Sequence, residues 1–154
     1  MKLTPQKINT FLFFKLPSAW WCGVRLKSID TASCSTSVKY RWINQNPFRS
    51  MYFAVQLMAA ELSTGALVLQ KIRNSNQNIS MLVGSQQSVY HKKVSGRIFF
   101  TCRDGQLIDE AINKTIATGE GVTVTLKTVG LNIGGEIACE AEFVWTLKLR
   151  QISR

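Results

Sequence analysis

The sequence is poor in carboxylates and histidine and has no closely spaced pair of cysteines. Its 154 residues include nine Asp and Glu against 19 Lys and Arg, a net charge of +10. This imbalance favours an anionic partner such as nucleic acid, a membrane surface or a phosphorylated ligand. The four cysteines are far apart and the single His91 has no nearby residue of a ligand type. The spacing therefore supports neither a zinc site nor a CxxC redox motif.

Long uncharged apolar runs are also missing. The two most apolar stretches, 11–22 and 51–69, contain Lys15 and Glu61, so we expect no segment inserted across a membrane. Lys15 and Pro17 also interrupt any signal-peptide pattern, and we expect a cytoplasmic protein with reduced thiols. The length and the 45% hydrophobic content fit one domain over residues 1–154, with residues 1–22 as an N-terminal helical extension.

The hydrophobic periodicity predicts an α+β fold. A period of two indicates about six antiparallel strands, near 23–30, 34–42, 81–90, 98–102, 122–127 and 137–149. Residues from Phe48 to about Ile72 are apolar around most of a helical circumference, which is typical of a helix enclosed by protein. Asn46 and Pro47 provide one signal for the helix start and Ser50 provides another, so the expected start spans about one turn. A shorter amphipathic helix is expected between Asp104 and Gly119. These elements fit a curved sheet wrapped around the long helix, although periodicity alone does not separate this hotdog arrangement from other α+β folds with an enclosed helix.

Glu61 is the only carboxylate between residues 31 and 103. On a helical wheel Arg49, Gln56 and Ser63 form a polar stripe, and Glu61 lies about 140° away from Gln56 among apolar residues. A carboxylate removed from water has a raised pKa and is more basic, which makes Glu61 a candidate general base or nucleophile. The alternative is a structural role, in which Glu61 pairs with an Arg or Lys or reaches solvent at a groove.

The stretch from Asn46 to Glu61 resembles the helix motif of hotdog-fold thioesterases of the phenylacetate-pathway and 4-hydroxybenzoyl-CoA type. The matching positions are Asn46, Ser50, Tyr52, Glu61 and Gly65. The resemblance implies a hotdog fold in which Glu61 acts as general base or nucleophile on a thioester. Backbone N–H groups at the helix start, around Asn46, Tyr52 and Phe53, would polarise the thioester carbonyl.

Two positions depart from that motif. Phe53 and Ala54 stand where the family has paired glycines, and Tyr52 stands where it usually has histidine. A glycine lets the backbone approach a ligand closely, which a bulky side chain hinders. Tyrosine still donates a hydrogen bond but does not titrate near neutral pH.

The resemblance extends to the strands. Residues 90–96 resemble a strand-turn-strand segment whose basic residue faces coenzyme A phosphates, and residues 119–150 resemble the closing strand pair. The basic residues expected to bind coenzyme A, as part of the substrate and with no separate cofactor, are Lys92, Lys93, Arg97 and Arg73.

The sequence thus favours hydrolysis of an acyl-CoA or acyl-carrier thioester by a homodimer or dimer of dimers. The long last strand, 137–149, suggests sheets joined edge to edge, because it would otherwise leave many unpaired backbone groups. The alternative is a non-catalytic acyl-CoA- or lipid-binding protein, which Phe53 and Ala54 favour. A nucleic-acid partner rests on charge alone and is not expected.

Overall fold

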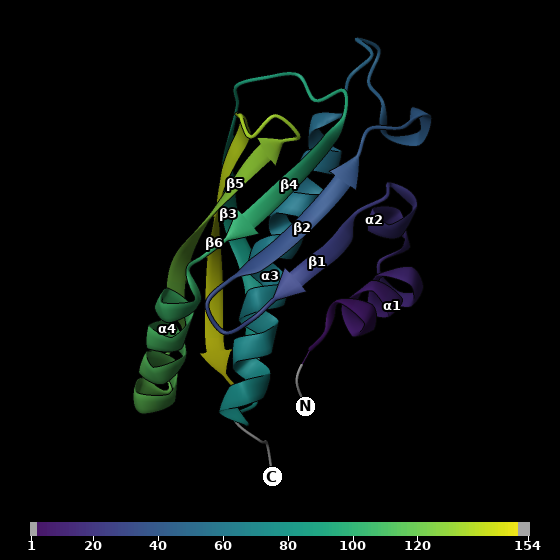
Figure 1. Cartoon of the computed structure of the whole chain (residues 1–154). Coiled ribbons are helices and arrows are strands. Elements are labelled where there is room, and N and C mark those ends of the chain that lie inside the picture. Colours follow the sequence, from purple (N-terminus) through teal and green to yellow (C-terminus); the bar gives the residue numbers. More distant parts are fainter. Residues whose placement is uncertain (1–2, 151–154) are drawn as a thin grey trace.

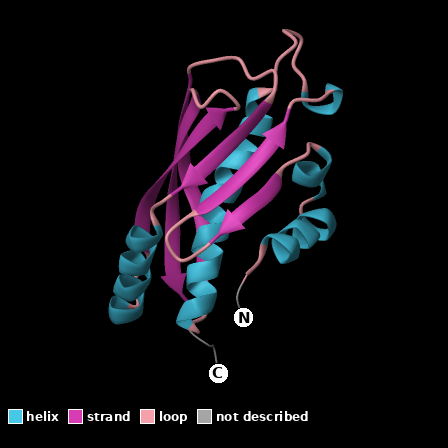
Figure 2. Ribbon diagram, viewed as in Figure 1, coloured by secondary structure: helices cyan, strands magenta, loops and turns pink. Residues whose placement is uncertain are grey.

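One antiparallel sheet of six strands curves around a long helix in the computed structural model, which describes residues 3–150 (Figures 1 and 2). The strands follow the order β1-β2-β4-β5-β6-β3 across the sheet. The α+β architecture predicted from periodicity is confirmed. The helices are α1 (Pro5–Lys15), α2 (Pro17–Trp21), the 3-10 helix η1 (Trp42–Asn44), α3 (Phe53–Ser75) and α4 (Gly105–Thr118). The strands are β1 (Arg25–Ile29), β2 (Cys34–Lys39), β3 (Ile79–Tyr90), β4 (Arg97–Cys102), β5 (Val122–Asn132) and β6 (Ile137–Leu149).

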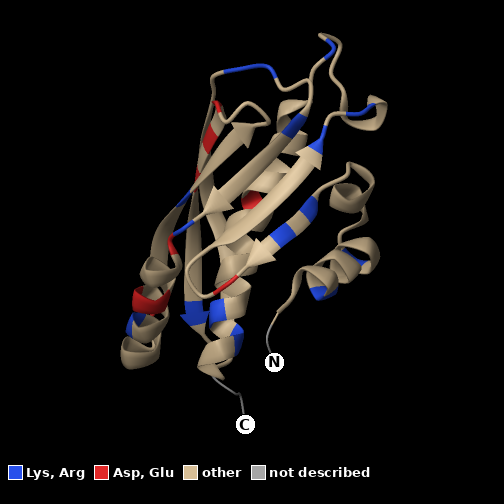
Figure 3. Ribbon diagram, viewed as in Figure 1, with Lys and Arg blue, Asp and Glu red and all other residues tan. Residues whose placement is uncertain are grey.

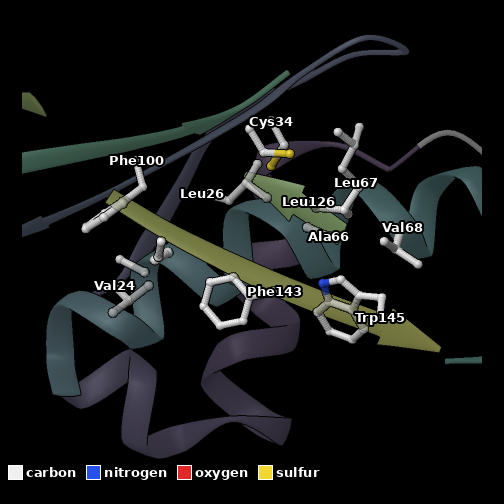
Figure 4. Close-up of a cluster of buried hydrophobic side chains, with 14 of the residues drawn as sticks. Val24, Leu26, Cys34, Ala66, Leu67, Val68, Phe100, Leu126, Phe143 and Trp145 are labelled. Carbon is white, nitrogen blue, oxygen red and sulfur yellow. The ribbon is translucent and has the colours of Figure 1, made fainter. Parts of the chain in front are cut away.

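The core lies between α3 and the concave face of the sheet (Figure 4). Alternate residues of β6 are buried, among them Phe143, Trp145 and Leu147, as the period of two predicts. Polar groups of this layer are hydrogen-bonded: the Ser63 hydroxyl lies 2.8 Å from that of Thr128. By length and hydropathy α3 is apolar enough to cross a membrane, but 56% of that window is buried inside the fold. The apolar character of α3 follows from its place under the sheet.

The central helix begins five residues later than the sequence predicted, at Phe53 instead of Phe48. The Asn46 side chain accepts hydrogen bonds from the N–H groups of Phe48 (2.9 Å) and Ser50 (3.2 Å). Arg49 has a left-handed φ of 57°, which a continuous helix does not allow. Asn46 and its neighbours therefore build a loop, and Arg49 does not belong to the helical stripe.

The prediction that the last strand lies at a sheet edge is wrong. β6 lies between β5 and β3, and the edges are β1 and β3. The pairing of β3 with β6 runs from Ile79 opposite Leu149 to Tyr90 opposite Cys139. The predicted strand-turn-strand unit around residues 90–96 is likewise not a hairpin, since β3 pairs with β6 and β4 pairs with β2 and β5. Residues 91–96 instead cross the end of the sheet (Figure 1).

The helices α1 and α2 lie beside β1 and α3 (Figure 1). The Asn9 side chain accepts a hydrogen bond from the N–H of Leu26 (2.9 Å) and donates one to its carbonyl (3.0 Å). Ile8 and Leu12 bury the inner face of α1. Pro17 separates α1 from α2, as expected of a residue that cannot continue a helix. The N-terminal helices are thus fixed to the edge of the sheet.

Candidate active site

Glu61 lies in an apolar cleft between α1 and the middle of α3. The cleft encloses about 140 Å³. The side chains around Glu61 are nearly all hydrocarbon and include Ile8, Phe11, Leu12 and Leu16 from α1, Leu62 and Leu69 from α3, and Met81 from β3. The sequence did not predict α1 as a wall of this cleft.

Burial raises the pKa of the Glu61 carboxyl above its ordinary value. The cause is desolvation, because water that would solvate the carboxylate is replaced by apolar side chains. Within residues 3–150 the three ion pairs of lysine with a carboxylate involve other groups: Lys71–Asp109, Lys92–Glu136 and Lys127–Glu142. The alternative that Glu61 is held in the fold by an ion pair with Lys or Arg is therefore not supported within the described residues.

The position of Glu61 depends on Gly65, one helical turn later. A Cβ atom on Gly65 would lie 3.0 Å from Oε1 of Glu61 and 3.1 Å from the ring of Trp145. The Trp145 Nε1–H donates to Thr64 Oγ1 (3.1 Å), and the Thr64 hydroxyl donates to the Glu61 carbonyl (2.9 Å). The glycine thus leaves room for the carboxylate and the indole side by side.

A second, larger cavity of about 480 Å³ lies at the start of α3. Asn46, Tyr52 and Phe53, the other three predicted catalytic residues, line it together. The N–H groups of Val55 and Gln56 donate to the Tyr52 carbonyl, whereas those of Phe53 and Ala54 have no acceptor in the described part of the chain. Free N–H groups at a helix start carry partial positive charge and suit an oxyanion.

Gln56 also lines the cavity at the helix start, although it was not among the predicted site residues. The residue is 4% exposed, and its Oε1 has no hydrogen-bond partner within residues 3–150. An unpaired buried amide oxygen is costly unless a ligand or water binds it. The sequence places Gln56 and Ser63 on one polar stripe of the helix, a signal that could have marked Gln56 as a candidate. The sequence does not show that this stripe faces the protein interior.

Three of the four predicted phosphate-binding residues lie near the helix-start cavity. Lys92 and Lys93 line it, and Lys93 and Arg97 line the neighbouring cavity. Lys92 pairs with Glu136, whereas the Lys93 ammonium lies 5.8 Å from the Phe48 ring centre and has no carboxylate partner within residues 3–150. Arg73 is in the last turn of α3, about 30 Å along the helix from Phe53. Arg73 is therefore not near the other three within one chain.

Glu61 and the helix start occupy separate cavities of one chain. Glu61 is about 12 Å farther along α3 than Phe53. The residues around the helix start do not line the Glu61 cleft, and Glu61 does not line the larger cavity. Met51 and Phe53 line the larger cavity. Within one chain, Glu61 and the helix start therefore do not line a common cavity.

Solved structures resemble this chain over nearly its whole length. A probable thioesterase of unknown function from Pseudomonas aeruginosa has a TM-score of 0.83 and 20% identity, with 97% of this chain and 99% of that chain covered. A thioesterase from Haemophilus influenzae has a TM-score of 0.73 and 10% identity, with 100% and 97% covered. A variant of another thioesterase from Pseudomonas aeruginosa has a TM-score of 0.73 and 12% identity, with 97% of each chain covered.

No protein-family model matches the sequence, and no curated protein matches it. The structural likeness shows that this chain has the hotdog fold, as the motif around Glu61 implied.

Proposed function

We propose that this protein hydrolyses an acyl thioester. The observation that carries the proposal is the Glu61 carboxylate, which lies in an apolar cleft without a cationic partner in the described chain. A desolvated carboxylate of raised pKa is a stronger base than a solvated one. The solved structures of the same fold described as thioesterases add support.

In the proposed reaction Glu61 removes a proton from a water molecule as the water oxygen attacks the thioester carbonyl carbon. The N–H groups of Phe53 and Ala54 stabilise the negative charge on the carbonyl oxygen. The C–S bond then breaks, and the sulfur takes up the proton from Glu61, which restores the carboxylate. The products are a carboxylic acid and a free thiol. Direct attack by Glu61 would give an anhydride that water then hydrolyses to the same products.

The Glu61 cleft fits a short aliphatic acyl group. Its volume of about 140 Å³ is roughly five times the share of one water molecule in the liquid, about 30 Å³. Apart from Glu61, the side chains that line it are apolar. An acyl chain of several carbons without polar substituents would therefore bind there, and the thiol portion would extend away from the cleft.

The active site would form between two copies of the chain joined along β3. This edge strand has twelve residues, and Leu82 and Val89 are exposed on it. Met81, near its start, lines the Glu61 cleft, and Tyr90, at its end, lines the helix-start cavity. Antiparallel pairing of β3 with its copy about a two-fold axis would place the start of one strand beside the end of the other. Glu61 of one chain would then approach the helix start of its partner.

The helix-start cavity would hold the coenzyme A portion of the substrate. The aromatic rings of Tyr52, Phe53 and Tyr90 pack edge to face along its wall. Lys93, which lacks a carboxylate partner in the described chain, would bind a phosphate group, as would Arg97. Lys92 is already paired with Glu136, so we expect it to contribute less to phosphate binding than Lys93. An acyl-carrier protein would present the same phosphopantetheine thioester.

The test is hydrolysis of a panel of acyl-CoA thioesters, which is measured as the release of free thiol. Glu61→Gln keeps the size of the side chain and removes its charge, and we expect it to abolish turnover while the fold is retained. Glu110→Gln, which changes an exposed carboxylate on α4, is the matched control and should hydrolyse at the rate of the unmodified chain. Unchanged turnover by Glu61→Gln would exclude Glu61 from the mechanism.

The second candidate is an acyl-CoA-binding protein without turnover. It is favoured by Phe53, whose ring takes the place of a glycine at the helix start and is half exposed in the larger cavity. Acyl-CoA binding that raises the melting temperature, with no thiol released from any thioester in the panel, would establish this alternative.

A further inference from the structure

The N-terminal helices α1 and α2 and their junction expose five large apolar side chains, which we call the aromatic patch: Phe11, Phe13, Phe14, Leu16 and Trp21. Phe14 is 70% exposed and Trp21 67% exposed, and the rings of Phe13 and Phe14 touch edge to face with centres 4.8 Å apart. Large apolar side chains exposed together on two helices in contact point to an interaction site. We propose that this patch docks the protein on an anionic lipid bilayer, as a peripheral contact and not as a span.

The charge around the aromatic patch identifies the partner as anionic. The first carboxylate in the sequence is Asp30, so no acid precedes it. Lys7, Lys15 and Lys27 are exposed in the same region, and Figure 3 shows basic but no acidic positions on α1 and β1. Aromatic side chains flanked by lysines are typical of helices that lie in the interface of anionic bilayers. A purely apolar protein partner would not account for the missing acids.

The patch is held rigidly by the rest of the fold. Asn9 binds both backbone groups of Leu26, and Leu12 is fully buried on the inner face of α1. The guanidinium of Arg25 lies 3.4 Å from the ring centre of Trp20 and donates to the Trp20 carbonyl. Because the helices are already folded and fixed, docking does not have to pay for ordering them, unlike the binding of a disordered segment.

The aromatic patch adjoins the Glu61 cleft. Phe11 and Leu16 belong to both, since their side chains line the cleft and are also exposed to solvent. A bilayer on the patch would lie at the mouth of the cleft, where amphiphilic acyl compounds concentrate. The docking stands independently of the proposed hydrolysis, because it requires only the patch and its charge.

The experiment measures co-sedimentation of the full chain with vesicles of phosphatidylglycerol and phosphatidylcholine in equal parts, and with vesicles of phosphatidylcholine alone. We expect binding to the anionic vesicles that weakens as salt is added. The double variant Phe14→Ser/Trp21→Ser should bind about tenfold more weakly or worse, because it loses the two most exposed rings of the patch. The control is Ile133→Ser in the β5–β6 turn, which removes an apolar side chain that is 75% exposed, about as exposed as Phe14 and Trp21. This variant should bind as the unmodified chain does.

Three results would overturn the proposal. One is equal binding to neutral and anionic vesicles or to neither, and another is equal binding by the double variant and the unmodified chain. The third concerns a second copy of the chain as the occupant of the patch. If light scattering shows that the double variant loses an oligomeric state that Ile133→Ser keeps, the patch is a contact between chains. Circular dichroism of both variants verifies that each has folded.

Discussion

A mixing experiment tests whether each active site takes Glu61 from one chain and the helix start from another. One variant is Glu61→Gln. The other is Phe53→Pro, which removes one of the two free N–H groups. Proline is tolerated at the first position of a helix, and Tyr52 has the extended backbone, with ψ of 132°, that a following proline requires. Phe53→Ala, which removes the ring and keeps the N–H, is its control.

The expected magnitudes follow from this geometry. Loss of one oxyanion donor should lower kcat by about a hundredfold to a thousandfold in Phe53→Pro, and Phe53→Ala should lose much less. Mixed dimers of the two variants contain one site with both groups intact and one site with neither. Random exchange makes half of the dimers mixed, so about a quarter of all sites should be intact and about a quarter of the unmodified activity should return.

The assay is thiol release from an acyl-CoA that the unmodified chain hydrolyses, after the variants are denatured together and refolded. Two different affinity tags show how much mixed dimer has formed. If mixed dimers are present and the activity does not exceed that of the separate variants, Glu61 and the helix start of the same chain act together. That result would refute the proposed assembly along β3 and leave the role of Glu61 to the single variant.

Gly65→Ala should destabilise the fold by about 1 to 3 kcal/mol in denaturant unfolding, because the new methyl group meets the Glu61 carboxylate and a tryptophan ring; Gly84→Ala, whose nearest neighbour would be 3.6 Å away, should change it less. Because the pKa of Glu61 is raised and the ionised form is the base, kcat/KM should fall as the pH drops through a value above that of an ordinary glutamate; an acidic limb at or below the ordinary value would contradict this. Lys93→Glu should raise KM at least about tenfold for acyl-CoA and leave hydrolysis of a thioester without phosphate groups unchanged, whereas Lys114→Glu on α4 should alter neither; an equal loss on both substrates would show that Lys93 does not bind phosphate.

The raised pKa of Glu61 also has a consequence for stability. A carboxyl group whose pKa is higher in the folded state stabilises the fold below its unfolded pKa, and this contribution is lost as the pH rises through the folded value. At neutral pH the buried charge is therefore a cost, and Glu61→Gln should melt at a higher temperature than the unmodified chain. The difference should shrink as the pH is lowered. A catalytic group kept at a cost in stability is common at active sites.

The two cavities of this chain differ in their chemistry. The cleft under α1 is small, apolar and contains one carboxylate, whereas the cavity at the start of α3 is larger, aromatic and flanked by lysines. An acyl-CoA has the same division between its acyl chain and its phosphorylated nucleotide. We infer this class of substrate from the match between the chemistry of the two cavities and the two parts of an acyl-CoA, more than from the fold itself.

The sequence by itself determined which segments are strands and which are helices, because the alternation of apolar residues is a local property of each segment. It also singled out Glu61, as a lone acid on an apolar helix face, before any contact was known. The tertiary structure alone decided that β3 is an edge strand, that α1 forms a wall of the cleft around Glu61, and that Gln56 faces inward. These features depend on contacts between segments far apart in the chain, which local periodicity does not encode.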